Sequence, residues 1–189
     1  KINEFAGNFY PDQYKKDSKL DINHNYLLEQ FADHDEILNK IKQVVIRGDF
    51  TLGSIVDEVE EEYAKLCGTK HAIGVGSGTD ALFLSLKSIG VDKGDEVITT
   101  PFTFFATVGA IVTSGATPVF VDCDDDLNIN ADLIESAITS RTKAIMPVHW
   151  SGRPCEMDSI NAIAEKHGIY VIEDACHAIQ ATYKNRPAG

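Results

Sequence analysis

The sequence predicts an α/β fold of three layers, in which helices cover both faces of a mainly parallel sheet. Five short apolar runs have the length of buried strands: 71–75, 96–100, 118–122, 143–148 and 169–173. Four segments with helical periodicity lie between or beside them: 79–89, about 104–114, 130–139 and 156–167. Strands that alternate with helices are typical of parallel βαβ units. The runs are almost entirely apolar, so both faces of the sheet should be covered.

The segment before this alternating region predicts an N-terminal arm followed by two helices. Residues 1–34 are polar, with scattered aromatic side chains and weak periodicity, and we assign them to an arm. Residues 35–189 then form a single large domain, as expected at about 150 residues per domain. Apolar residues at helical spacing predict one helix that should end at Gly48 and a second that runs to Cys67. The loop GDFTLG at 48–53 joins these two helices.

Two later helices carry recognisable end signals. Asn130 precedes the sequence ADLIESAI and is a suitable N-cap, since its side-chain oxygen can accept from a free backbone amide. Gly168 follows the last helical pattern and should end it in a left-handed conformation. Both signals support the predicted boundaries of these helices.

Charge and cysteine content exclude several classes of protein. Seventeen basic and 29 acidic residues give a net charge of −12, which disfavours nucleic acids and anionic membrane surfaces as partners. No apolar run approaches the ~18 residues needed to span a bilayer, and the first residues contain no apolar core of a signal peptide. The four cysteines form no CxxC pair, so we expect no metal site and a reduced, cytoplasmic protein.

Polar and aromatic residues follow the predicted strands, where an open α/β sheet binds its ligands. The first strand is followed by GSGTDAL, which opens a helix. Glycines allow backbone amides to approach a phosphate, and a helix N-terminus adds partial positive charge. A tight turn with Thr79 as a helix cap is the structural alternative. A dinucleotide site is a second alternative, although the spacing GxGxG is one residue shorter than GxGxxG.

Three further residues follow the second and fifth strands. Phe104 is placed to stack on a flat heterocycle, or else to pack in the core. Asp174 ends a buried strand, where a carboxylate is costly unless it is paired. A cationic ring nitrogen, as in pyridoxal phosphate, is one such partner, and a buried basic side chain is the alternative. His177 lies three residues further on, within reach of the same ring, or else serves as a structural histidine.

From about residue 26 onward the sequence resembles the DegT/DnrJ/StrS family of pyridoxal-phosphate sugar aminotransferases. The blocks that carry the resemblance are GDFTLG, VGSGTDAL, GDEVITTPFTFFAT, GATPVFVD and VIEDACHA, in the order of the family. The resemblance implies the large domain of the aspartate-aminotransferase fold (fold type I). It also implies transfer of an amino group, commonly from glutamate, to a keto sugar carried on a nucleotide, by a homodimer.

The same resemblance implies a role for each site residue. Gly78, Thr79 and the adjoining Asp80 amide would hold the cofactor phosphate, and Phe104 would stack on the pyridine ring. Asp174 would pair with the ring nitrogen and His177 would lie beside the ring hydroxyl, which makes these two the expected catalytic residues. The GDFTLG loop would help line the entrance for the nucleotide sugar.

The lysine to which the family attaches its cofactor lies in an FSF…K block that the sequence up to Gly189 does not contain. Lys143, Lys166 and Lys184 do not lie in such a block, and Lys184 has the surroundings of a turn residue. We therefore expect this chain to be an incomplete large domain, with the lysine and the small domain beyond it. A family dehydratase with histidine in place of that lysine, or a non-catalytic regulatory member, remains an alternative.

Overall fold

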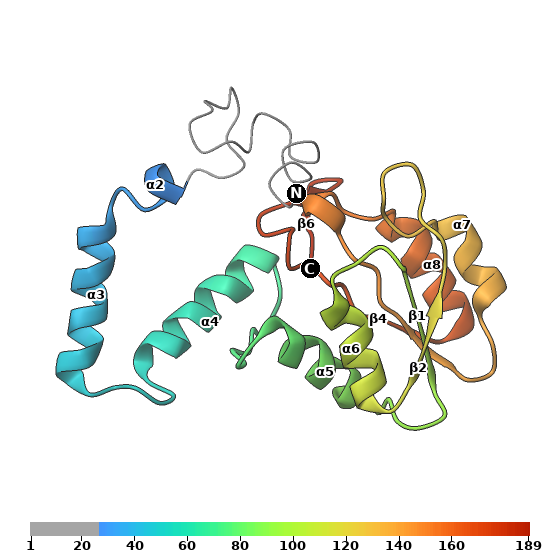
Figure 1. Ribbon diagram of the computed structural model, residues 1–189, viewed down its shortest axis with the longest axis horizontal. Coiled ribbons are helices and arrows are strands. Elements are labelled where there is room, and N and C mark those ends of the chain that lie inside the picture. The colour runs from blue at the N-terminus through green and yellow to red at the C-terminus, as the bar shows by residue number, and fades with distance from the viewer. Residues whose placement is uncertain (1–26) are drawn as a thin grey trace, which may run out of the picture. The chain divides into compact units, whose positions relative to one another are not determined.

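The computed structural model describes residues 27–189 (Figure 1). Four of its strands form one parallel sheet in the order β2-β1-β3-β4. Strands β1 and β2 pair in register, from Glu96 opposite Thr117 to Thr99 opposite Phe120. A bridge between Val148 and Asp174 extends the pairing of the other two strands toward their carboxyl ends. The strands are β1 (Glu96–Thr99), β2 (Thr117–Phe120), β3 (Thr142–Ile145) and β4 (Tyr170–Val171).

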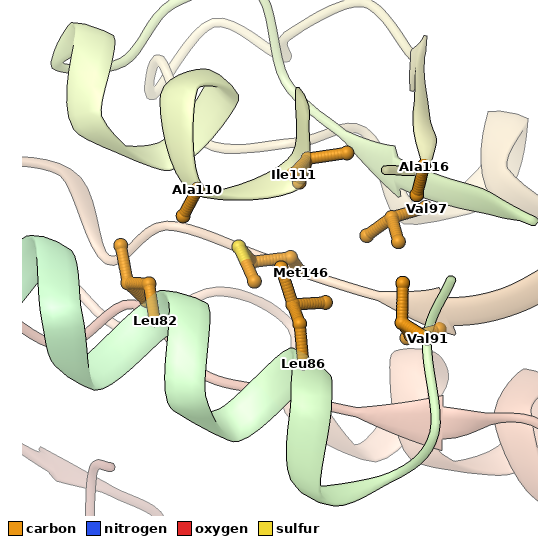
Figure 2. Packing of buried hydrophobic residues seen from close by; sticks show 9 residues of the cluster. Leu82, Leu86, Val91, Val97, Ala110, Ile111, Ala116 and Met146 are labelled. Carbon is orange, nitrogen blue, oxygen red and sulfur yellow. The ribbon is translucent and has the colours of Figure 1, made fainter. Parts of the chain in front are cut away.

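Helices pack on both faces of this sheet. Val97 of β1 faces one hydrophobic cluster, which also contains Leu82 and Leu86, while its neighbour Ile98 faces the other. This alternation follows from the two-residue period of a strand. In Figure 2, Leu82 and Leu86 point from their helix toward Met146, which continues from β3. The three-layer α/β fold predicted from the sequence is confirmed.

The helices of the two layers begin and end close to the predicted residues. Asn130 accepts from the Asp132 amide as an N-cap, and Gly168 ends the last helix in a left-handed conformation, both as predicted. The predicted 130–139 helix is shorter than expected, because its last turn tightens to 3₁₀ geometry. One layer contains α5 (Gly78–Ser88) and α6 (Phe105–Ser114), and the other contains α7 (Ala131–Ile134), η2 (Glu135–Ala137) and α8 (Met157–His167).

The predicted strand at 71–75 is wrong: among the described residues, no strand is found there. Ile73 is 80% exposed, and the Gly74 amide donates to the Glu60 carboxylate (2.6 Å) instead of to a neighbouring strand. A strand requires a hydrogen-bonded neighbour, and the described part of the chain places none beside this segment. The apolar pattern alone could not reveal this.

A hairpin follows the sheet near the C-terminus. Its strands β5 (Thr182–Tyr183) and β6 (Arg186–Pro187) are joined by Lys184 and Asn185, which both have positive φ. Such a two-residue turn matches the twist of the strands. The Lys184 ammonium donates to Asp158 (2.6 Å), and the lysine is a turn residue, as predicted.

The first helices belong to a separate compact unit, which ends at Gly53. Gly48 ends its longer helix at φ 68°, as predicted, and residues 48–53 form a loop. Most of the predicted 1–34 arm lies outside the described residues, and its boundary stays a prediction. No helix described between residues 27 and 189 is long and apolar enough to cross a membrane. The helices of this unit are α2 (Leu27–Gln30) and α3 (His34–Arg47), and α4 (Ser54–Cys67) is the first helix of the second unit.

Candidate functional site

A cavity of about 250 Å³ lies beyond the carboxyl ends of the parallel strands. It is built from four segments that are distant in the sequence but follow strands or begin helices. This is the edge at which an open α/β sheet binds ligands. All predicted site residues except Asp80 line the cavity. The walls are the start of α5 (Gly78, Thr79, Leu82), the entry to α6 (Thr103, Phe104, Ala106), the turn after β3 (Val148, Trp150) and the stretch after β4 (Asp174, Cys176, His177).

The start of α5 forms one wall of this cavity. Ser77 caps the helix: its hydroxyl accepts from the Asp80 amide (3.1 Å) and donates to the Asp80 carboxylate (2.9 Å). The cap is therefore Ser77 and not Thr79. The first amides of a helix have no partner within it and carry partial positive charge. A Cβ at Gly78 would lie 3.4 Å from the Cys176 sulfur, which is an ordinary van der Waals contact, so space alone does not require glycine there.

Phe104 lies on the opposite wall, at the entry to α6. Its side chain is 60% exposed, with its ring centroid 4.4 Å from that of Phe105. Core packing, the alternative considered for this residue, does not account for that exposure. The ring is available as a platform on which a flat heterocycle can stack.

Asp174 is a buried residue of the cavity wall, and the described part of the chain offers it no basic partner. Only 5% of the residue is exposed. Its carboxylate accepts from the Thr107 hydroxyl (2.7 Å) and, at 3.4 Å, from the Cys176 amide. Among the described residues, no Lys, Arg or His lies within ion-pair distance of it. A buried carboxylate without a cation is costly, so this position favours a positively charged ligand.

Trp150 forms part of the wall beside His177, with ring centroids 5.3 Å apart in an edge contact. A left-handed turn places it there: Ser151 has φ 53° and Gly152 has φ 85°. A Cβ at Gly152 would come within 2.9 Å of the His177 carbonyl oxygen, so only glycine allows this approach. We did not predict Trp150 as a site residue, although its place directly after a strand was a usable signal.

Two buried polar side chains anchor the turn that carries Trp150. The Asn128 side chain accepts from the Trp150 amide (3.0 Å) and donates to the Arg153 carbonyl (3.1 Å). His149 is fully buried, and its Nδ1 accepts from the Cys155 amide (3.1 Å). Its hydrogen is therefore on Nε2, which donates to Glu173 (2.7 Å).

The protonation of the groups around the cavity follows from burial and hydrogen bonding. Burial, followed by the nearby Asp174 carboxylate, raises the pKa of the Cys176 thiol to about 11, so this thiol is neutral at neutral pH. Burial works against the charged form of Glu173, but hydrogen bonds from His149 and the Gly189 amide hold its pKa below the usual range. Glu173 is thus charged, while the cavity wall contains no reactive thiolate.

A family model describes most of this chain: the DegT/DnrJ/EryC1/StrS aminotransferase family matches residues 32–189. The chain belongs to this family. The spore coat polysaccharide biosynthesis protein SpsC of Bacillus subtilis strain 168 is 47% identical to it over 155 residues. That match covers 82% of this chain and 40% of SpsC, so the chain spans less than half the length of this relative.

Two solved structures share the fold of this chain. DesV of S. venezuelae superposes with a TM-score of 0.83 at 40% identity, over 86% of this chain and 44% of DesV. NtdA of Bacillus subtilis, solved with bound cofactor PMP, gives a TM-score of 0.80 at 32% identity, over 96% of this chain and 45% of NtdA. These similarities confirm the predicted fold and the family resemblance.

Proposed function

We propose that this chain forms the cofactor-binding part of a pyridoxal-phosphate-dependent enzyme that aminates a nucleotide-linked keto sugar for amino-sugar biosynthesis. The single observation that carries the proposal is the buried Asp174 carboxylate, which has no basic partner in the described chain. It faces the same cavity as the exposed ring of Phe104 and the start of α5. A flat ligand with a cationic nitrogen on its ring and a phosphate fits this set of groups.

The residues present fit pyridoxal phosphate, and we assign their roles accordingly. The amides of Gly78 and Thr79 bind the phosphate at the positive end of α5. The Asp80 amide, which donates to Ser77 here, takes part if the Ser77 hydroxyl turns away. The Phe104 ring stacks on the pyridine, and Asp174 holds a proton on the ring nitrogen. When bound, the cofactor withdraws electrons from the substrate carbon that loses its proton.

The remaining residues and partners are assigned from the family. His177, which lines the cavity beside Trp150, lies by the ring hydroxyl. The GDFTLG loop at 48–53 contributes to the entrance for the nucleotide sugar, and glutamate is the proposed amino donor. A homodimer is proposed because the family's active sites use residues from both subunits. The four free cysteines fit a reducing cytoplasm.

The experiment measures cofactor binding in the 189-residue chain and amino transfer in the full gene product. We expect Asp174→Asn to lower turnover by about tenfold or more, with a smaller loss of cofactor, because the phosphate site is untouched. Lys184→Gln is a control, since Lys184 donates to Asp158 in the hairpin and does not line the cavity. Turnover of Asp174→Asn within about threefold of the wild type would refute the assigned role. Cofactor binding without amino transfer would favour the regulatory alternative.

A further inference from the structure

A chain of two hydroxyl groups lies behind the Asp174 carboxylate. Thr107, in the first turn of α6, is fully buried, and its Oγ1 lies 2.7 Å from Asp174 Oδ2. Thr103 lies four residues earlier, at the cavity wall, with its Oγ1 2.8 Å from that of Thr107. The Cys176 thiol also donates to this carboxylate, but an S–H group is a weak donor. Thr107 is therefore its principal polar support.

The direction of this hydrogen-bond chain follows from the chemistry of its end group. An ionised carboxylate only accepts, so the Thr107 hydroxyl must donate to Asp174. The Thr107 oxygen is then free to accept, and Thr103 donates to it. A threonine in a helix often bonds to the carbonyl four residues earlier, but here the Thr107 hydrogen is directed at the carboxylate. Both dipoles are aligned toward the negative charge.

We propose that Thr107, supported by Thr103, is a positioning residue that keeps Asp174 charged and directed at the ring nitrogen of the cofactor. The inference rests on the proposed function for the identity of that ligand. A hydrogen bond to the charged form of a carboxylate favours that form, most strongly in a buried site. Since no described Lys, Arg or His forms an ion pair with Asp174, the hydroxyl chain stabilises the charge until the cationic ring binds.

The test compares Thr107→Val, which keeps the shape and removes the hydroxyl, with Thr107→Ser, which restores the hydroxyl. Thr99→Val is the matched control, because Thr99 is equally buried but donates to the Met146 carbonyl (2.8 Å) and does not line the cavity. Thr103→Val is a second variant at the cavity wall, should Thr107→Val not fold. Far-UV circular dichroism checks the fold of each variant.

The probe is pyridoxamine phosphate, whose amine cannot react with surface lysines as an aldehyde would. Trp150 is the only tryptophan of the sequence and lines the cavity, so quenching of its fluorescence reports binding. Affinity is measured as a function of pH. The other titratable groups near Asp174 are Cys176 and His177 on the wall and the His149–Glu173 pair, and the variants change none of them.

We expect Thr107→Val to weaken binding roughly 10- to 100-fold at neutral pH, as for loss of a hydrogen bond to a charged group. The pH dependence of the affinity should also differ from that of the wild type, because the variant lacks the hydroxyl that donates to the Asp174 carboxylate. Thr107→Ser should restore both properties, Thr103→Val should give a smaller change of the same sign, and Thr99→Val should resemble the wild type.

Two kinds of failure can be separated. If Thr107→Val and Thr99→Val have the same affinity and the same pH profile, while Asp174→Asn weakens binding, the positioning role is refuted and the proposed function stands. Lack of rescue by Thr107→Ser would also refute the role. If the wild type does not bind the probe, or Asp174→Asn binds it with unchanged affinity and pH profile, the proposed cofactor site itself is wrong.

Discussion

Replacing Asn128 by alanine tests how firmly the turn that carries Trp150 is held. The substitution removes the two shortest hydrogen bonds of the Asn128 side chain, to the Trp150 amide and the Arg153 carbonyl, which lie 3.0 and 3.1 Å from it. Each buried polar group left unpaired costs about 1–3 kcal/mol. Both hydrogen bonds are only partly buried, so water recovers part of the loss. We expect the free energy of unfolding to fall by about 2–3 kcal/mol.

Urea unfolding, followed by the fluorescence of Trp150, measures this change. In folded Asn128→Ala the emission of Trp150 should also shift to longer wavelength, because its ring loses a fixed position beside His177. Asn130→Ala is the control: Asn130 caps α7 by accepting from Asp132, and its loss should cost about 1 kcal/mol with unchanged emission. Equal losses for the two variants, together with unchanged native emission, would refute the reasoning.

Three further outcomes are expected. An alkylating reagent at about pH 8 should leave Cys155 unmodified until the protein unfolds, because burial raises the pKa of its thiol to about 12; peptide mass spectrometry would detect earlier labelling. The pKa of Glu173 is lower in the folded protein than the value near 4.5 of the unfolded chain. The charged carboxylate therefore stabilises the fold fully above that pH, and the stabilisation is lost as the pH falls. The urea midpoint of Glu173→Gln should accordingly fall less steeply below about pH 5 than that of the wild type. Leu86→Ala, in the core shown in Figure 2, should cost about 2–5 kcal/mol, whereas Leu84→Ala, at a position 47% exposed, should cost under about 1 kcal/mol in the same assay.

The layered fold was predictable because the signals for it are local. Adjacent apolar residues such as Val97 and Ile98 indicate a strand covered on both faces, and Gly168 marks the end of a helix. The segment 71–75 has a similar apolar pattern but forms no strand in the described chain. Its state depends on a hydrogen-bonded neighbour, which a pattern within the segment does not encode.

The site was predictable to the extent that ligands gather at strand ends. That rule brought Gly78, Phe104 and Asp174 together, and the structure places all three around one cavity. It did not predict Thr107, because the side of a helix that meets a carboxylate 67 residues later depends on packing between elements. Trp150 also follows a strand, but the rule does not give the direction of its side chain, which the left-handed turn after it sets.

The segments that line the cavity are far apart in the sequence, so they leave the ribosome at different times. The turn at Gly78 is translated about 100 residues before Asp174, which corresponds to about 5–20 s at the ribosome. Throughout this interval the start of α5 has been translated, but Asp174, which lines the same cavity, has not. A ligand that needs both walls therefore binds only after β4 has docked beside β3. Its binding then selectively stabilises the nascent chains that have completed the sheet over those that have not.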